Sequence, residues 1–483
     1  MKEVMTIEEM LKGESKTVEF KESLPSNTDK YMKSVVAFAN GSGGSIIFGV
    51  EDDTRVVKGI PEDSAFQTVD AITNAICDSC TPQVIPNVTL QNVDGKMVII
   101  ATIYPGTQRP YYITSQGKEK GTYIRTSGTS RHVDGTQLKE LEFEGSNRYF
   151  DQTYCVGKTV TEDEINNLCQ IMKERAMAAC KTDEERGLVK DITKGNLLSW
   201  GLLTKREDEI FPTNAFVLMT ENDFPQARIQ CAVFKGNTRS EFIDKREYDG
   251  PIYEQIEEAY QFVLRNIHYG ATIRGLYRVD SYELPTDCIR ELICNAVTHR
   301  SYLDEGNIQV ALYDDRLEIT SPGMLFGGLT IEDIKEGRSK PRNRGIAYAF
   351  AAMKIIEKWG TGIPRIIKSC KEFGIREPEF IEMGMDIRVN LYRDQVDVDK
   401  TPISADKVPI SADKTPISAD KSLSVNENKV MEHLQSNQAI TNKMVQELCG
   451  IKDTASKNLL RKMVEKELLS AVGEKKSREY RLK

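Results

Sequence analysis

The chain has 483 residues, of which 39% are hydrophobic and 29% are charged, and its formal net charge is −8. This length exceeds what one hydrophobic core organises, so several domains are expected. No apolar run is long enough to span a bilayer, no signal-peptide pattern opens the chain, and the acidic balance argues against nucleic acid as a partner of every domain. We therefore expect a cytoplasmic, multidomain α+β protein without membrane contacts.

Residues 1–145 alternate short strands with helices, which predicts an α/β domain. Strands are predicted from apolar runs, and one helix is predicted from an apolar period of about 3.6 residues. The predicted strands are Thr17–Phe20, Ser45–Val50, Met97–Ile103 and Gly121–Thr126, and the predicted helix is Lys30–Ala39.

Three carboxylates lie in and around the first of these strands: Glu14, Glu19 and Glu22. Carboxylate oxygens are suitable ligands for Mg²⁺ or Mn²⁺. Glu14 and Glu19 are five residues apart, so they converge only if Glu14 lies in the loop that precedes the strand. Acidic residues near strand ends are equally typical of a solvated sheet edge. The pattern alone therefore leaves a metal site and a solvated edge both open.

Residues 146–283 mix helices and strands and contain no motif to which chemistry can be attached. Gly157, Lys158 and Thr159 resemble the end of a phosphate-binding P-loop. The motif requires a glycine five residues before Gly157, and Gln152 stands there. A RecA-type motor is therefore not expected.

A domain predicted over 284–397 begins with a helix that carries a line of polar residues. Glu291, Asn295 and His299 follow one another at intervals of four and share one helix face, whereas the opposite positions are apolar. Such polar groups are costly to bury unless they bind something. The alternative interpretation is a solvated stripe.

Glycines and cations follow this helix. Ser321-Pro322-Gly323, the basic segment 338–345 and Gly360-Thr361-Gly362 are the relevant stretches. Glycines let backbone amides approach phosphates, and cations balance phosphate charge. Strands are predicted at Ile308–Tyr313, Arg316–Thr320 and Asp386–Leu391.

These motifs resemble the GHKL ATPase family, and more closely its divergent branch among bacterial transcriptional regulators labelled RecG-like. The resemblance is carried by DDRLEITSPGMLFGGLT (Asp314–Thr330), RNRGIAYAF (Arg342–Phe350) and EKWGTGIPRI (Glu357–Ile366). It implies an α/β sandwich that binds ATP and Mg²⁺.

The resemblance also implies roles for individual residues. Glu291 matches the catalytic, water-activating glutamate, and Asn295 matches the Mg²⁺-binding asparagine. Ser321 to Gly323 departs from the family, because typical members have an adenine-reading aspartate there. The remaining residues expected to bind ATP are His299, Gly323, Arg342, Asn343, Gly360, Thr361 and Gly362.

Three N-terminal segments together resemble the Schlafen AlbA-like domain: ESKTVEFKESL (Glu14–Leu24), VVAFANGSGGSIIFGVEDD (Val35–Asp53) and GTYIRTSGTSR (Gly121–Arg131). In Schlafen nucleases, the matching acidic residues hold Mg²⁺ or Mn²⁺. The resemblance also extends to many bacterial members that contain the same E-x4-E motif and are described as regulators or DNA-binding modules.

The resemblance to Schlafen nucleases implies that Glu14, Glu19 and Asp52 form a catalytic, metal-binding triad, with the flanking residues Glu51 and Asp53 as alternatives at the third position. A basic surface should then lie beside them to hold a phosphate backbone. Lys16, Lys21 and Arg125 are the candidates for that surface.

A spacer over 398–422 follows. It reads KTPISAD KVPISAD KTPISAD K from Lys400, a seven-residue repeat with a proline in every unit. The prolines exclude a coiled coil, and a semi-extended linker is predicted.

Residues 423–483 look like a winged helix. Helices are predicted at Val425–Leu434, Thr441–Cys449 and Thr454–Lys466, and two strands within Leu468–Leu482. The second and third helices form a helix-turn-helix, which binds DNA through its second helix. The residues expected to face DNA are Ser456, Lys457, Arg461 and Lys462 on the helix, and Lys475, Lys476 and Arg478 on the wing.

The sequence thus predicts an ATP-binding transcriptional regulator that binds DNA or RNA and whose domain arrangement is switched by nucleotide. The alternative is a Schlafen-like, metal-dependent RNA or DNA endonuclease of phage defence or stress response. A homo-oligomer is expected in both cases.

Overall fold

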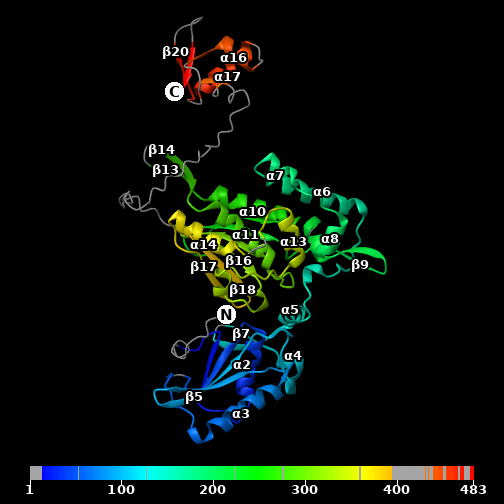
Figure 1. The fold of residues 1–483 in the computed structure, drawn as a ribbon, viewed down its shortest axis with the longest axis vertical. Helices are drawn as coiled ribbons and strands as arrows, with labels where there is room; N and C mark the ends of the chain where they lie inside the picture. Colours follow the sequence, from blue (N-terminus) through cyan, green and yellow to red (C-terminus); the bar gives the residue numbers. More distant parts are fainter. Residues whose placement is uncertain are drawn as a thin grey trace. The chain divides into compact units, whose positions relative to one another are not determined.

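The computed structural model contains two compact units, Met1–Val398 and Asp399–Lys483. It describes residues 13–393 except 53, 127, 222–223, 275–276 and 358–359, and then 430, 433–434, 439–449, 453–465, 468–472 and 479–482. Only the backbone is described at 271–274, 277–280, 447, 453–455, 458, 462, 465, 471–472 and 482. Helices and sheets are mixed in both units, as expected for an α+β multidomain chain (Figure 1). No helix in these ranges is long and apolar enough to cross a bilayer.

The N-terminal part of the first unit contains a four-stranded sheet with the order β1-β2-β5-β4. β1 (Val18–Lys21) runs parallel to β2 (Gly44–Phe48), whereas β5 (Lys96–Ile103) is antiparallel to β2 and to β4 (Asn87–Val93). The bounds of β1, β2 and β5 lie within two residues of the predicted ranges. Their apolar runs are therefore sufficient to identify them.

Two helices, α2 (Asp29–Asn40) and α3 (Glu62–Ser79), cover one face of this sheet. Val18 and Phe20 point to the other face, where they join a separate apolar cluster. Because strand side chains alternate between faces, Glu19 lies on the α2 side. It is only 7% exposed there, so β1 buries a carboxylate.

Smaller elements complete the N-terminal part. They are β3 (Cys80–Thr81), β6 (Tyr112–Ile113), η1 (Thr114–Gln116), α4 (Gly117–Gly121), β7 (Tyr123–Thr126), β8 (Thr129–His132) and α5 (Gly135–Gly145). β7 and β8 form a hairpin, and β7 lies against α2. A capping box fixes the start of α5, because the side chains of Asp134 and Gln137 each accept a hydrogen bond from the other residue's backbone N–H.

Helices and two hairpins follow. Their bounds are η2 (Phe150–Gln152), α6 (Glu162–Ala178), α7 (Asp183–Gly187), α8 (Lys194–Trp200), β9 (Leu203–Arg206), β10 (Glu209–Pro212), α9 (Asn214–Thr220), β13 (Tyr269–Arg274) and β14 (Tyr277–Tyr282). β9 pairs with β10, and β13 pairs with β14.

A second, six-stranded sheet has the order β12-β11-β15-β16-β18-β17. Its strands are β11 (Ile229–Phe234), β12 (Phe242–Tyr248), β15 (Ile308–Leu312), β16 (Arg316–Pro322), β17 (Glu379–Met383) and β18 (Asp386–Tyr392). β11 pairs in parallel with β15 and so joins two distant segments. The sheet therefore reaches upstream of residue 284, where the ATP-binding domain is predicted to begin.

Helices cover one face of this second sheet. They are α10 (Ile252–Asn266), α11 (Thr286–His299), α13 (Arg344–Ala352) and α14 (Gly362–Phe373), and they share one apolar core with the strands. The opposite face combines a small apolar cluster of Phe234, Ala311 and Tyr313 with a network of charged side chains. Glu318, only 1% exposed, forms ion pairs there with Arg239, Arg316 and Arg388.

The C-terminal unit contains α16 (Asn442–Cys449) and α17 (Asp453–Glu465). Its three strands are β19 (Ile440–Thr441), β20 (Leu469–Val472) and β21 (Glu479–Leu482), in the order β19-β21-β20. Helices and strands contribute to one apolar core. The second and third predicted helices and the predicted strand pair are present, whereas most of the helix predicted at Val425–Leu434 lies outside the described residues. The assignment as a winged helix stays a prediction.

One residue expected on the DNA-facing side is not on the surface. Ser456 is fully buried, and its hydroxyl donates to the carbonyl oxygen of Asn442 at 3.1 Å. The expectation for Ser456 is therefore wrong, because this side of α17 packs against α16. The spacer predicted over 398–422 lies outside the described residues.

Candidate functional site

The polar face of α11 opens on a cavity of about 350 Å³. Glu291, Asn295 and His299 all line it, as their spacing predicts, while Leu292 and Ala296 add apolar contacts. Ile319, Ile387 and Val389 of the second sheet, together with Phe380, supply much of the apolar lining. The cavity thus combines an apolar floor with a few polar groups, the composition typical of small-molecule sites.

Glu291 is held by a cation and lies at the start of α14. Its Oε2 is 3.2 Å from a guanidinium nitrogen of Arg365. A Cβ added to Gly362 would lie 2.2 Å from its Oε1, so this approach requires glycine at 362. The N–H groups of a helix start favour a carboxylate. The catalytic role predicted for Glu291 therefore requires Arg365 to release it.

Asn295 lies one turn further along α11 and is half-buried. Within the described part of the chain, its side-chain amide has no hydrogen-bond partner. An amide oxygen is a suitable ligand for Mg²⁺. Asn295 is therefore available for the metal that the sequence predicts.

His299 is neutral at physiological pH. Burial, and to a lesser extent the nearby cation Arg342, lower the pKa of His299 to about 4. A neutral imidazole offers one hydrogen-bond donor and one acceptor. His299 can therefore contact a ligand without adding charge to the cavity.

Arg342 and Asn343 do not line this cavity, although the sequence assigns them to ATP binding. The Asn343 amide donates to the carbonyl oxygens of Thr298 at 2.9 Å and Arg300 at 2.8 Å. Nε of Arg342 donates to the carbonyl oxygen of His299 at 3.1 Å. Both side chains thus hold the C-terminal end of α11, and their direct contact with ATP stays a prediction.

Other cations of the same basic segment do reach the cavity: Arg338, Lys340 and Arg344. Arg338 is paired with acidic side chains, at 2.8 Å in the case of Asp333. Nζ of Lys340 donates to the carbonyl oxygen of Gly327 at 2.9 Å. Lys340 has no carboxylate partner in the ranges that the structure covers, so its charge is available to an anion.

Arg344 is held in the same way by neutral groups. Its guanidinium donates to the Tyr348 hydroxyl at 3.1 and 3.2 Å and lies over the rings of Tyr149 and Tyr348. Among the described residues, no carboxylate pairs with it. The sequence shows the basic segment, but only the structure shows that Lys340 and Arg344 face the cavity.

The glycines predicted to bind ATP lie where neighbouring groups approach the backbone closely. Gly323, Gly360 and Gly362 line the cavity. A Cβ at Gly360 would lie 2.1 Å from the carbonyl oxygen of Gly337, and φ of Gly360 is +70°, so glycine is required there. Thr361 is not a lining residue, and its hydroxyl donates to Glu357 at 3.0 Å.

Ser321 begins the segment that departs from the GHKL pattern, and its side chain has a structural contact. Its hydroxyl donates to the carbonyl oxygen of Ala296 at 3.0 Å and so ties β16 to α11. The acidic residues among the described lining residues are Glu291 and Glu357, and none is an aspartate. Adenine reading by an aspartate therefore has no counterpart in the described lining.

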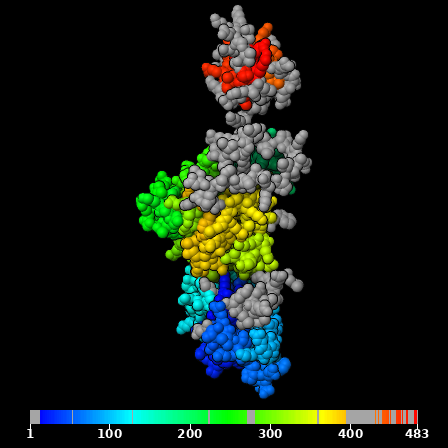
Figure 2. Space-filling view, turned by 90° about the vertical axis from the view of Figure 1, so that its left-hand side faces the viewer, coloured from blue at the N-terminus to red at the C-terminus, as the bar shows by residue number. Residues whose placement is uncertain are grey.

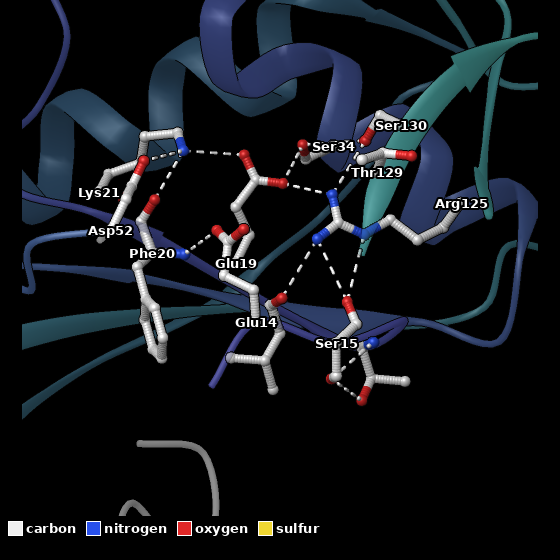
Figure 3. A network of polar contacts seen from close by, with 12 residues as sticks. Glu14, Ser15, Glu19, Phe20, Lys21, Ser34, Asp52, Arg125, Thr129 and Ser130 are labelled. Atoms are coloured by element: carbon white, nitrogen blue, oxygen red, sulfur yellow. Dashed lines mark hydrogen bonds and ion pairs between the residues drawn. The ribbon is translucent and has the colours of Figure 1, made fainter. Parts of the chain in front are cut away.

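The second predicted site surrounds β1 (Figure 3). Glu19 accepts hydrogen bonds from the guanidinium of Arg125 and from the Ser34 hydroxyl. Nζ of Lys21 lies 3.0 Å from Oε1 of Glu19 and 3.5 Å from Oδ2 of Asp52. A lysine ammonium therefore lies between two of the three carboxylates proposed to hold a metal.

Glu14 lies in the segment before β1, and its Oε1 accepts the backbone N–H of Phe20 at 3.0 Å. No group of three His, Cys, Asp or Glu side chains in the described ranges is placed to hold a metal ion. The triad of Glu14, Glu19 and Asp52 is therefore not arranged around one metal ion in the described ranges, because Arg125 and Lys21 pair with Glu19, and Oε1 of Glu14 accepts a backbone N–H. Cleavage activity itself stays a prediction.

The basic surface expected beside this triad is not present in the predicted form. Arg125 is only 4% exposed and also donates to backbone carbonyls of the β1 segment. Nζ of Lys16 is 2.5 Å from the Glu382 carboxylate. Lys21 forms ion pairs with Glu19 and Asp52. The expectation that these cations hold a phosphate backbone is wrong for Arg125, because it is buried.

On α17, Lys457 and Arg461 are exposed and four residues apart, so they share one side of the helix. The side chain of Lys462 lies outside the described residues, as do Lys475, Lys476 and Arg478. The DNA contacts of all six residues stay a prediction.

Two family models match the chain. Residues 14–134 match "Schlafen, AlbA_2", and residues 305–398 match "Putative ATP-dependent DNA helicase recG C-terminal". The first match includes Glu14, Glu19 and Asp52. The second begins after α11, so it does not include Glu291, Asn295 or His299, and neither match reaches the C-terminal unit.

Solved structures are also similar to this chain. The crystal structure of the DIP2311 protein from Corynebacterium diphtheriae is 18% identical with a TM-score of 0.41, and the match covers 99% of this chain and 93% of that one. The solution structure of the N-terminal domain of a putative ATP-dependent DNA helicase RecG-related protein from Nitrosomonas europaea is 20% identical with a TM-score of 0.22, covering 27% and 95%. The family matches confirm that the first unit contains a Schlafen AlbA-like segment and a divergent, RecG C-terminal-like ATPase segment.

Proposed function

We propose that the cavity beside α11 binds ATP with Mg²⁺. One observation carries the proposal: Lys340 and Arg344 face the cavity and are held by neutral oxygens, without a carboxylate partner in the described ranges. Cations that the protein does not neutralise favour an anionic ligand such as a triphosphate. The apolar floor offers a surface for the base.

The remaining polar groups support this assignment. Asn295 would hold Mg²⁺ through its amide oxygen, and it lines the cavity together with Gly360 and Gly362. The magnesium ion would balance phosphate charge. Glu291 would orient or deprotonate a water only after losing its contact with Arg365. We therefore propose that ATP binding is the primary activity and that ATP hydrolysis requires the Glu291–Arg365 ion pair to open.

We further propose that the protein is a nucleic-acid-binding transcriptional regulator with a nucleotide-switched domain arrangement. The description of the family model matched over residues 305–398 supports a nucleic-acid-related ATPase, because it names an ATP-dependent DNA helicase. In the C-terminal unit, Lys457 and Arg461 would contact the DNA backbone from α17. The endonuclease alternative is less well supported, because Lys21 and Arg125 occupy the oxygens of Glu19.

Calorimetry tests the binding proposal. The full chain is titrated with a non-hydrolysable ATP analogue and Mg²⁺, and Asn295→Ala is compared with Asn167→Ala, an exposed asparagine on α6. We expect binding by the wild type and by Asn167→Ala, and loss of the Mg²⁺-dependent part in Asn295→Ala. Absence of binding by the wild type would refute the proposal.

A further inference from the structure

One loop forms a wall of two cavities. The loop 323–329, named the shared loop here, contributes five residues to the cavity beside α11 and four to a second cavity against the N-terminal part of the unit. Met324 of this loop also packs against an apolar cluster that includes Leu141 of α5. The shared loop therefore contacts both the cavity beside α11 and the N-terminal part of the unit.

The shared loop fits the N-terminal part without a gap at Gly328. A Cβ added there would lie 2.8 Å from a guanidinium nitrogen of Arg109 and 2.9 Å from the carbonyl oxygen of Gly41. Arg109 is paired with Glu144 of α5 and also donates to the Gly41 carbonyl. The N-terminal residues (blue to cyan) adjoin yellow residues of the same unit in Figure 2.

Arg342 connects three elements with one guanidinium. It donates to the carbonyl oxygen of His299 at the end of α11, to that of Met324 in the shared loop, and at 2.7 Å to the Glu140 carboxylate of α5. Arg342 is 8% exposed and the Glu140 side chain 13%. A buried charge pair of this kind is strongly penalised when one partner is removed. The position of α5 is therefore linked to the wall of the cavity.

We propose that Arg342 and Glu140 are the positioning pair through which occupancy of the nucleotide cavity is transmitted to the N-terminal, AlbA-like part. This inference rests on the proposed nucleotide binding. A ligand that presses on Met324 or on the end of α11 changes the two carbonyls that hold Arg342, and the pair passes this change to α5. By linkage, a ligand of the N-terminal part must alter nucleotide affinity by the same factor.

Hydrogen exchange of the full chain tests the inference. Exchange of α5 amides is measured with and without the non-hydrolysable ATP analogue and Mg²⁺, while calorimetry under the same conditions reports binding. In the wild type, we expect nucleotide to change exchange in α5 by about fivefold or more. In Glu140→Gln, we expect nucleotide still to bind and the response of α5 to be lost.

Matched controls separate coupling from general damage. Glu142→Gln removes a different ion pair of α5, with Lys118 inside the N-terminal part, and should keep the response. Gly328→Ala should lose it, whereas Gly374→Ala has a similar positive φ but no heavy atom within 4 Å of the added Cβ and should keep it.

The outcomes distinguish the two claims. A wild type that binds nucleotide without a change in α5 overturns the coupling and leaves the binding proposal intact. A Glu140→Gln protein that retains the full α5 response also overturns the coupling. A wild type that binds no nucleotide overturns both.

Discussion

Two polar sites of the first unit differ in how their charges are balanced. Around β1, the carboxylate of Glu19 is paired with Arg125 and Lys21. Beside α11, Lys340 and Arg344 contact only neutral acceptors among the described residues. A cluster that neutralises its own charges stabilises the fold, whereas unpaired cations at a cavity attract an anionic ligand. The first site is therefore structural in this arrangement, and the second is the candidate for ligand binding.

The largest expected effect concerns the first site. Arg125→Met leaves the buried Glu19 without its guanidinium partner and should lower the free energy of unfolding of the N-terminal part by about 3–5 kcal/mol. Hydrogen exchange of β1 and α2 measures this loss locally. Lys118→Met, which removes an exposed pair with Glu142, should cost at most about 1 kcal/mol. Equal effects of the two variants would show that the Glu19 cluster is not structural.

The second prediction concerns the pH dependence of stability at the cavity. The folded-state pKa of His299, about 4, lies below its ordinary value of 6.5, so the native protein binds fewer protons than the unfolded chain between these values. The stability that neutral His299 contributes should therefore be lost as pH falls from about 6.5 to 4, by up to about 3 kcal/mol. Thermal unfolding of wild type and His299→Gln across this range measures it. A constant difference between the two proteins would contradict the prediction.

The third prediction addresses the unpaired cations. Lys340→Ala combined with Arg344→Ala should weaken binding of the ATP analogue by about 10- to 100-fold, because two charge-assisted contacts are lost. Calorimetry measures the affinity. The control Lys335→Ala removes a cation of α12 (Ile331–Lys335) that is paired with Glu377 and does not line the cavity. Unchanged affinity in the double variant would remove the main argument for a nucleotide.

The smallest expected effect is that of Glu14→Gln. A glutamine oxygen can still accept the Phe20 N–H, so the free energy of unfolding should change by less than about 1 kcal/mol. Nucleotide affinity should be unchanged. Mn²⁺-dependent cleavage of RNA or DNA by the wild type that Glu14→Gln abolishes would instead support the endonuclease alternative.

Local patterns predict much of this architecture. The period of four along α11 is sufficient to place Glu291, Asn295 and His299 together, and the apolar runs identify β1, β2 and β5. Local sequence patterns do not determine which side chains of the basic segment 338–345 face the cavity. Arg342 turns away from the cavity because it meets Glu140, which lies 202 residues earlier in the chain.

Pairing between strands that are distant in the sequence explains the other differences between the sequence-based prediction and the structure. Residues of β11 pair with β15 across a long intervening segment, which no local pattern reveals. The place of Lys21 between Glu19 and Asp52 likewise depends on the parallel pairing of β1 with β2. The sequence shows which charged residues are present near each site, whereas only tertiary contacts decide which charges remain unpaired.

The most direct test of the central claim is photolabelling of the full chain with an azido-ATP analogue, followed by peptide mapping. We predict that labelled peptides fall within 284–392, include the region of Lys340 and Arg344, and disappear when excess ATP competes. Competed labelling confined to the peptides around β1 or to the C-terminal unit, with none in 284–392, would contradict the account.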